Sequence, residues 1–178
     1  MATLSDGTEA RVLAESNGFQ VLQAGQMVYV VDRGWGWVST ATFVFALVGF
    51  LLMVGPLVLA FVAGEPLAAF GVLAGLLVAS GAFFVRKARE RMREAPVAPR
   101  MVLLVIDVGA STVRDAGGQA LCPLAQLEIG RAMQIGSSSA ALRARWPGGK
   151  RIIARGTPFG GDVGPIEATL RRFVPARR

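Results

Sequence analysis

The sequence predicts an α-helical membrane hairpin joined to a small α+β domain, mainly a β meander with a C-terminal helix. Two observations predict the hairpin. The chain is 53% hydrophobic with a mean hydropathy of +0.50, and between Val38 and Val85 the only ionisable residue is Glu65. A third predicts the domain: after Met101 the apolar residues form short runs separated by glycine-rich turns.

The first apolar run, residues 37–63, is long enough for a transmembrane helix, because about 20 residues at 1.5 Å per residue span the hydrocarbon core. Pro56 is expected to kink it in its second half. Trp35 and Trp37 precede the most apolar part, where interfacial aromatic side chains anchor helix ends. We therefore predict these tryptophans as interfacial anchors.

The second run, residues 66–85, is close to the minimum length for a span. Gly64 can end the first helix and Pro66 suits the first turn of the next, with Glu65 between them. So short a link predicts antiparallel neighbouring helices. No ionisable residue lies at mid-membrane depth, which argues against a self-contained pump or transporter.

Small residues recur at every fourth position of the second run, at Gly71, Gly75 and Ala79. This spacing lets two helix backbones approach closely. The stripe is expected either to pack within the hairpin, against Ala46 or Gly49, or to contact a membrane helix of another protein.

The net charge of +7 is concentrated after the second run. Residues 86–100 predict a basic juxtamembrane helix followed by a stiff Pro-rich linker. Its cations are expected to contact anionic lipid headgroups; they are Arg86, Lys87, Arg89, Arg91 and Arg93. Because positively charged flanks stay cytoplasmic, both chain termini are expected in the cytoplasm and the hairpin tip outside.

Two further segments complete the predicted organisation. Residues 1–36 form an N-terminal cytoplasmic segment whose runs Phe19–Leu22 and Met27–Val31 predict a β-hairpin. Residues 101–178 form a cytoplasmic β-rich domain. The N-terminal hairpin needs a partner for stability and could join the sheet of that domain, a question the sequence leaves open.

Within the β-rich domain, short apolar runs predict strands and an amphipathic run predicts a final helix. The helix begins near Pro165, places Ile166, Leu170 and Phe173 on one face and ends at Pro175. Residues 147–150 predict a hairpin turn. The predicted strands are Val102–Val108, Ser111–Asp115, Ala132–Ile135, Ala141–Trp146 and Arg151–Ala154, with a further strand or short helix at 121–129.

A meander closed by one helix and tied to a transmembrane hairpin resembles the bacterial pleckstrin-homology-like (PH-like) membrane proteins. The strand 103–108, the turn 115–118, the hairpin 141–154 and the helix 166–173 carry the resemblance. It implies a PH-like cytoplasmic domain and a multi-pass protein of the bacterial inner membrane. It brings no catalytic residues with it.

No constellation for catalysis, cofactor binding or metal binding is found in the sequence. The chain has no histidine, the commonest general base and metal ligand, and its one cysteine, Cys122, has apolar neighbours that predict a buried thiol. Gly148-Gly149-Lys150 lacks the flanking residues of a phosphate loop. We therefore expect no enzyme, no cofactor, no metal, no nucleic-acid partner and no small-molecule substrate.

Three functional hypotheses follow. The first is a non-catalytic accessory or scaffold subunit, whose hairpin docks on a larger membrane protein complex. The second is a module that senses anionic lipid, with the juxtamembrane arginines joined by cations of the β-rich domain: Arg143, Arg145, Lys150, Arg151 and Arg155. The third is a homo-oligomeric channel or scaffold. The expected partners are membrane lipids and other membrane subunits or further copies of the chain.

Overall fold

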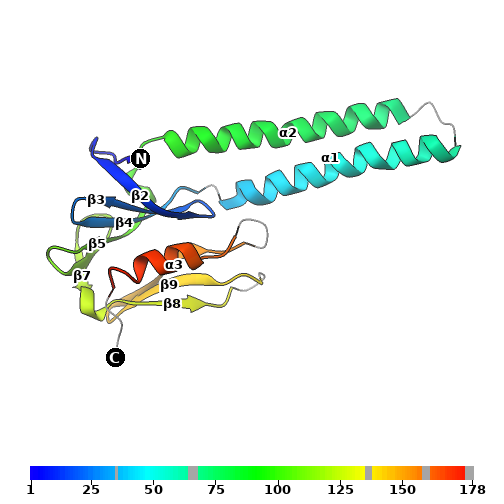
Figure 1. Cartoon of the computed structure of the whole chain (residues 1–178). Helices are drawn as coiled ribbons and strands as arrows, with labels where there is room; N and C mark the ends of the chain where they lie inside the picture. Colours follow the sequence, from blue (N-terminus) through cyan, green and yellow to red (C-terminus); the bar gives the residue numbers. More distant parts are fainter. Residues whose placement is uncertain (35, 64–67, 135–137, 158–160, 175–178) are drawn as a thin grey trace. The chain divides into compact units, whose positions relative to one another are not determined.

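A computed structural model describes residues 1–34, 36–63, 68–134, 138–157 and 161–174. Within these residues the chain is a mixed α+β fold with two sheets and three α-helices. It divides into a β-unit, Met1–Gly36 with Met92–Arg178, and a helical unit, Trp37–Arg91 (Figure 1).

The β-unit contains ten strands among its described residues. Before the helical unit come β1 (Ala2–Thr3), β2 (Glu9–Ser16), β3 (Phe19–Ala24) and β4 (Met27–Asp32). After it come β5 (Val102–Asp107), β6 (Thr112–Arg114), β7 (Ala120–Pro123), β8 (Glu128–Ala132), β9 (Ala141–Trp146) and β10 (Gly149–Arg155). Short 3₁₀ turns lie at η1 (Pro99–Met101) and η2 (Leu124–Gln126), and helix α3 spans Gly164–Leu170.

The helical unit interrupts one continuous sheet. Seven strands follow each other in the order β1 to β7, every neighbouring pair antiparallel. The β4–β5 pair joins Met27 to Asp107 at one end and Val31 to Val102 at the other, across the whole helical insertion. The N-terminal hairpin therefore joins the sheet of the C-terminal domain, and residues 1–36 and 101–178 form one unit rather than two.

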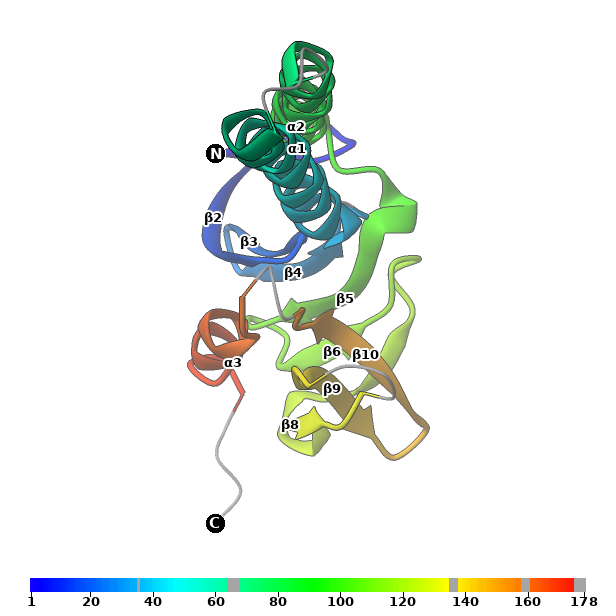
Figure 2. The same ribbon diagram turned by 90° about the vertical axis from the view of Figure 1, so that its right-hand side faces the viewer.

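One core lies between the two sheets. The three-stranded sheet, in the order β10–β9–β8, contacts β3 and β4 through β10, while α3 contacts β2, β3 and β8 (Figure 2). Side chains from both sheets are fully buried there, among them Val30, Leu104 and Leu142. Ile166 and Leu170 of α3 are buried in the same core, as the helical pattern predicts. Phe173 packs at the edge of this core, but it lies in the turn after α3 and not in the helix.

A smaller apolar cluster covers the other face of β2–β5. Leu4, Leu22, Val31 and Val97 are buried in it. The Val97 amide donates a 2.9 Å hydrogen bond to the Thr3 carbonyl. The segment after α2, expected to act as a linker, is therefore built into the β-unit.

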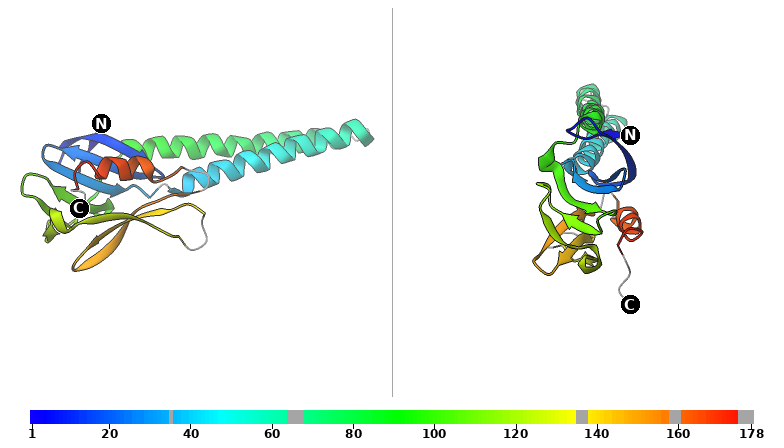
Figure 3. Two further views of the ribbon diagram at one scale, coloured as in Figure 1. Left: turned by 60° about the horizontal axis from the view of Figure 1, so that its bottom comes forward. Right: turned by 90° about the vertical axis from the view of Figure 1, so that its left-hand side faces the viewer.

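The helical unit consists of α1 (Gly36–Ala63) and α2 (Ala68–Glu94), which lie side by side and run in opposite directions (Figures 1 and 3). Pro56 is inside α1 as expected. The basic residues continue α2 without a break as far as Glu94, which confirms the expected helical extension beyond Val85. The predicted turn residues 64–66 are outside the described residues.

Some strand boundaries differ from the expectation. Strands β1 and β2 were not expected from the sequence. The strand expected at Ala132–Ile135 is not found at residues 133–134; β8 lies earlier, at Glu128–Ala132, and residue 135 is outside the described part. The β2 strand has a bulge between Val12 and Ala14, which breaks the period-two alternation that reveals a strand. The hairpin of β9 and β10 matches its prediction closely, with Trp146 paired to Gly149. The final helix, expected to run to Pro175, is shorter than that: α3 ends at Leu170, and residues 171–173 form turns.

Candidate functional site

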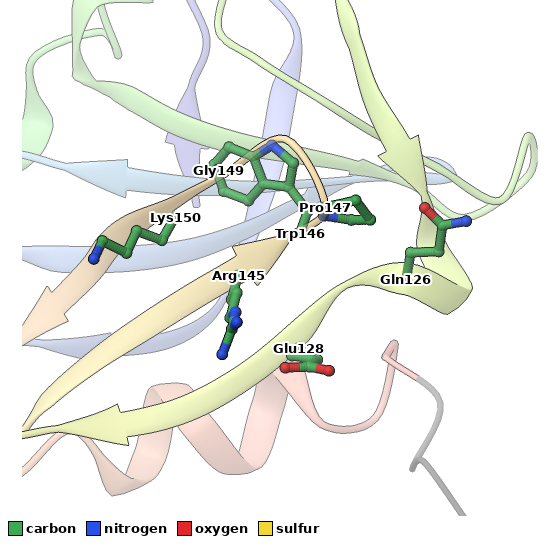
Figure 4. A pocket seen from close by; sticks show the side chains of 7 residues that line it. All are labelled: Gln126, Glu128, Arg145, Trp146, Pro147, Gly149 and Lys150. Carbon is green, nitrogen blue, oxygen red and sulfur yellow. The ribbon is translucent and has the colours of Figure 1, made fainter.

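A polar pocket of about 640 Å³ opens on the three-stranded sheet, inside the β-unit (Figure 4). It is lined by residues from η2, from β8 and from both strands of the last hairpin. These are Gln126, Glu128, Arg145, Trp146, Pro147, Gly149 and Lys150. The volume is within the range of small-molecule sites, about 300–1,000 Å³.

The strand register fixes the charged side chains of this pocket. Arg145 in the centre of the sheet is paired with Glu128 on one side and with Lys150 on the other. Cα partners across antiparallel strands project to the same face. Since the neighbours Leu142 and Ala144 face the core, this row faces outward, and Arg145 and Lys150 are both exposed.

A tight turn forms one wall of the pocket. Pro147 and Gly148 connect β9 to β10, and side-chain atoms of Trp146 lie next to Gly148 and Gly149. A Cβ atom on Gly149 would be 3.3 Å from Cζ2 of Trp146, closer than ordinary contact, so the absence of a side chain at Gly149 leaves room for the indole. Trp146 also packs against the core, which holds its ring in place.

The row of charged residues carries a net positive charge. It holds two cations, Arg145 and Lys150, and one carboxylate, Glu128. Among the described residues neither cation forms a salt bridge. Like charges directly opposite on neighbouring strands destabilise a sheet by about 0.2–1 kcal/mol. The Arg145–Lys150 pair therefore carries an electrostatic cost, which Glu128 on the other side of Arg145 offsets in part and an anion between the two cations would reduce further.

The predicted headgroup-binding residues of α2 differ in exposure and in whether they form ion pairs. Arg86, Lys87, Arg91 and Arg93 are exposed and Arg89 is partly exposed. Arg86 forms an i,i+4 pair with Glu90 at 3.6 Å, and Arg93 pairs with Glu15 of β2 at 3.3 Å. Arg93 is thus bound to the β-unit, whereas Lys87 and Arg91 project freely into solvent within the described part of the chain.

The small-residue stripe is at the contact between α1 and α2. A Cβ atom on Gly75 would be 2.8 Å from the Gly49 carbonyl oxygen, and one on Gly49 would be 3.1 Å from Cβ of Ala79. Gly75 and Ala79 thus face Gly49 within the helical unit. Gly71 is part of α2, but no side-chain environment is described at that position. Trp35 is outside the described residues, and Trp37 is in α1 with its side chain likewise undescribed.

Arg33, which the sequence analysis did not single out, is bound to the carboxyl end of α2. Its Nε donates to Gln20 Oε1 at 3.0 Å, and its Nη1 donates to the carbonyls of Met92, at 3.4 Å, and Ala95. The last carbonyls of a helix lack intrahelical donors and carry partial negative charge. A guanidinium can both donate hydrogen bonds to these carbonyls and offset their charge. Burial lowers the pKa of Arg33, and nearby Glu15 partly opposes that shift.

Cys122 is buried as expected, and desolvation raises the pKa of its thiol. A thiol with a raised pKa forms little of the reactive thiolate. No group of three or more His, Cys, Asp or Glu residues is arranged to hold a metal ion within the residues that the structure describes.

Membrane-spanning character is found in one helix. Thr40–Val58 of α1 is long and apolar enough to cross a bilayer, the only such segment among the described residues. The second expected span, 66–85, begins outside the described residues, and no second span is identified within the part that the structure describes. Helix α2 carries basic side chains from Arg86 onward. No family model, curated protein or solved structure matches this chain.

Proposed function

We propose that this chain is a non-catalytic integral membrane accessory subunit, whose helical insertion docks on a larger membrane protein complex. The observation that carries the proposal is the exposed apolar surface of α1. Only 6% of its Thr40–Val58 window is buried inside the protein. A surface this apolar needs a non-aqueous environment or a protein partner.

The topology supports a role in which membrane segment and β-unit act together. The helical insertion lies between β4 and β5, two strands hydrogen-bonded along their length. The β-unit needs strands from both sides of the insertion. It is therefore tied at two adjacent points to the helical insertion, and we propose that it stays next to the bilayer, where it contacts the soluble face of the same complex.

The packing of α1 on α2 indicates which surface meets the partner. Because Gly75 and Ala79 contact Gly49, that part of the small-residue stripe is used within the helix pair. The exposed side of α1 remains, with Phe50 at 59% and Leu51 at 58% exposure. We propose that α1 presents this side to the partner, with α2 as the second span of a hairpin whose tip is outside the inner membrane.

A photo-crosslinking residue placed at Phe50 tests the proposal in native membranes. The expected result is a crosslink to a membrane protein of one identity, in fixed stoichiometry. The same crosslinker at Met53, whose backbone nitrogen and side chain lie at the contact with α2, is the matched control and should react within the chain. Crosslinks from Phe50 to lipid alone would overturn docking, and crosslinks to further copies of the chain would favour the homo-oligomer instead.

A second candidate function, recognition of anionic lipid by a PH-like module, is favoured by the free cations of α2. Lys87 and Arg91 follow the apolar part of the helix directly, where each basic side chain near an anionic surface contributes about 1 kcal/mol. Full-length protein with K87Q and R91Q, reconstituted in nanodiscs, should lose its enrichment of anionic over zwitterionic lipid. Unchanged enrichment would count against this function.

A further inference from the structure

We propose that the pocket between η2 and the β9–β10 turn is a binding site for a phosphate group carried on a small organic ligand. The site is wholly inside the β-unit and does not depend on the accessory-subunit proposal. It rests on three features: the opposed cations Arg145 and Lys150, the fixed indole of Trp146, and the volume of the pocket.

The two cations offer complementary ways of binding phosphate. The Arg145 guanidinium is a planar fork that matches two oxygens at once, and the Lys150 ammonium is a compact charge with three donors. Side chains on Cα partners of an antiparallel pair have Cβ atoms about 4.5–5.5 Å apart. Both cations can therefore reach one phosphate without any movement of the backbone.

The rest of the pocket suits the organic part of such a ligand. Its volume of about 640 Å³ is far larger than a phosphate needs. Pro147 and the indole of Trp146, which lies on the opposite side of β9 from Arg145, are the apolar lining residues, and the side-chain amide of Gln126 provides both a donor and an acceptor (Figure 4). A lone phosphate would leave these groups unused, so the ligand is expected to be a phosphomonoester or phosphodiester of a small polar or aromatic group.

The wall of the pocket is formed by regular secondary structure and a proline-containing turn, which restrict its conformations and so favour specific binding. The turn contains a proline, and the sheet register extends to its last residues, Trp146 and Gly149. Gly130, one row further along the outward face of β8, has nothing within 4 Å of the position of a Cβ atom, so this face of the sheet is open to a ligand. A preorganised site loses little conformational entropy on binding.

The experiment uses the full chain in a maltoside detergent, which carries no phosphate. Replacing Trp35 and Trp37 by Phe leaves Trp146 as the only tryptophan, so its fluorescence reports on the pocket. The soluble probes are inorganic phosphate and glycerol 3-phosphate. The membrane-borne probe is phosphatidic acid added to phosphatidylcholine nanodiscs, compared with phosphatidylcholine alone.

The expected result is a saturable change in Trp146 emission with glycerol 3-phosphate or with phosphatidic acid, and the arm that saturates at lower concentration identifies the source. Removing either cation by R145Q or K150Q should weaken binding about tenfold, as expected for the loss of one charge-assisted contact. Both side chains are exposed, so the variants should fold, and thermal melting checks this. R155Q removes an exposed charge from the same strand outside the pocket and should change binding less than about twofold.

Three results would overturn the site. The first is no saturable change with any of the phosphate probes. The second is equal weakening by R155Q and K150Q, which would indicate general attraction of anions to a basic protein. The third is tighter binding of an acidic peptide than of either soluble phosphate probe, which would assign the pocket to a protein segment.

Discussion

At the scale of single residues, Arg33 places a buried positive charge inside the β-unit. It is 5% exposed, its Nη2 has no partner in the described structure, and its other nitrogens bind Gln20 and the end of α2. Gln20 in turn donates to Glu15, which pairs with Arg93. One connected polar network therefore fixes the last turn of α2 to β2, β3 and the residue after β4.

Removing this charge should destabilise the β-unit. For R33M, which keeps much of the aliphatic length, we expect a loss of about 2–3 kcal/mol, because hydrogen bonds from a charged group are lost and helix carbonyls are left without donors. The measurement is chemical unfolding followed by β-sheet circular dichroism. R100M, an exposed arginine of η1, is the control and should cost less than about 0.5 kcal/mol. Equal effects of the two substitutions would show that the network contributes nothing specific.

Glu167 of α3 makes the stability of the β-unit depend on pH. Its carboxylate accepts hydrogen bonds from Arg131 at 2.7 Å and from Arg171 at 2.9 Å, and these bonds lower the pKa of Glu167 below its usual value. A carboxyl whose pKa is lower in the folded state stabilises the fold above its unfolded pKa. That contribution is lost as the pH falls through the folded pKa.

Thermal melting between about pH 6 and about pH 3 tests this pH dependence. The wild-type melting temperature should fall across this range, and in E167Q the fall should be shallower. R131Q, which removes the donor that shifts the pKa most, should reduce the slope in the same direction. A slope unchanged in both variants would assign the acid sensitivity to other groups.

At the scale of elements, the contact between α1 and α2 sets how closely the two helices approach. In G75A the new methyl group would meet the Gly49 carbonyl and the Met53 nitrogen at 2.8 and 2.9 Å, atoms of backbone that cannot rotate away. The helices must therefore separate, at a cost of about 1–3 kcal/mol. Chemical crosslinking of cysteines introduced on facing positions, or unfolding in detergent, measures the change.

Two other glycines of the same helices provide a graded control. Gly55 has nothing within 4 Å, so G55A should be neutral or stabilise α1 by up to about 1 kcal/mol through helix propensity. A Cβ atom on Gly81 would be 3.3 Å from Cδ1 of Phe45, a side chain that can shift. The change in stability caused by G81A should therefore be intermediate between those caused by G55A and G75A. If G75A and G55A behave alike, the small-residue stripe has no role inside the helix pair.

The elements also show what the sequence could and could not predict. Strands β3, β4, β9 and β10 and the helices have local signals: apolar alternation, a Pro-Gly turn or a long uncharged run. The pairing of β4 with β5 has none, because Val31 and Val102 are separated by the whole helical insertion. The Arg33 contacts, 59 and 62 residues apart in sequence, are likewise invisible without the fold.

The pocket was partly predictable. The basic residues Arg145 and Lys150 were recognised as a candidate lipid-contacting surface, but grouped with Arg143, Arg151 and Arg155. The strand register distinguishes these basic residues. Arg145 and Lys150 are direct cross-strand partners, whereas Arg143 is paired with Ile152. Arg151 donates a hydrogen bond to the Leu103 carbonyl at 2.7 Å. A one-residue change of register would exchange the faces, so only the fold could select the two cations.

At the scale of the whole molecule, the β-unit is one folding unit built from two parts of the chain. Replacing the helical unit, residues 37–91, by a short Gly/Ser linker should leave a β-unit that folds in water, because the core between the two sheets needs no residue of the helical unit. Residues 101–178 alone should not fold, since they lack Val21, Val28 and Val30 of the core. Circular dichroism and amide exchange on both fragments measure this, and a folded 101–178 fragment would contradict it.

The central claim is that the helices form a membrane hairpin inserted into one β-unit, so both sides of the insertion must lie in the same compartment. Single cysteines at Ser5, Ala116 and Glu65, in a chain with Cys122 replaced by Ser, test it by labelling whole cells with a membrane-impermeant maleimide. Ser5 and Ala116 are exposed positions before and after the insertion. We expect labelling of E65C in intact cells and labelling of S5C and A116C only after lysis. Labelling of S5C and A116C from opposite sides would contradict it.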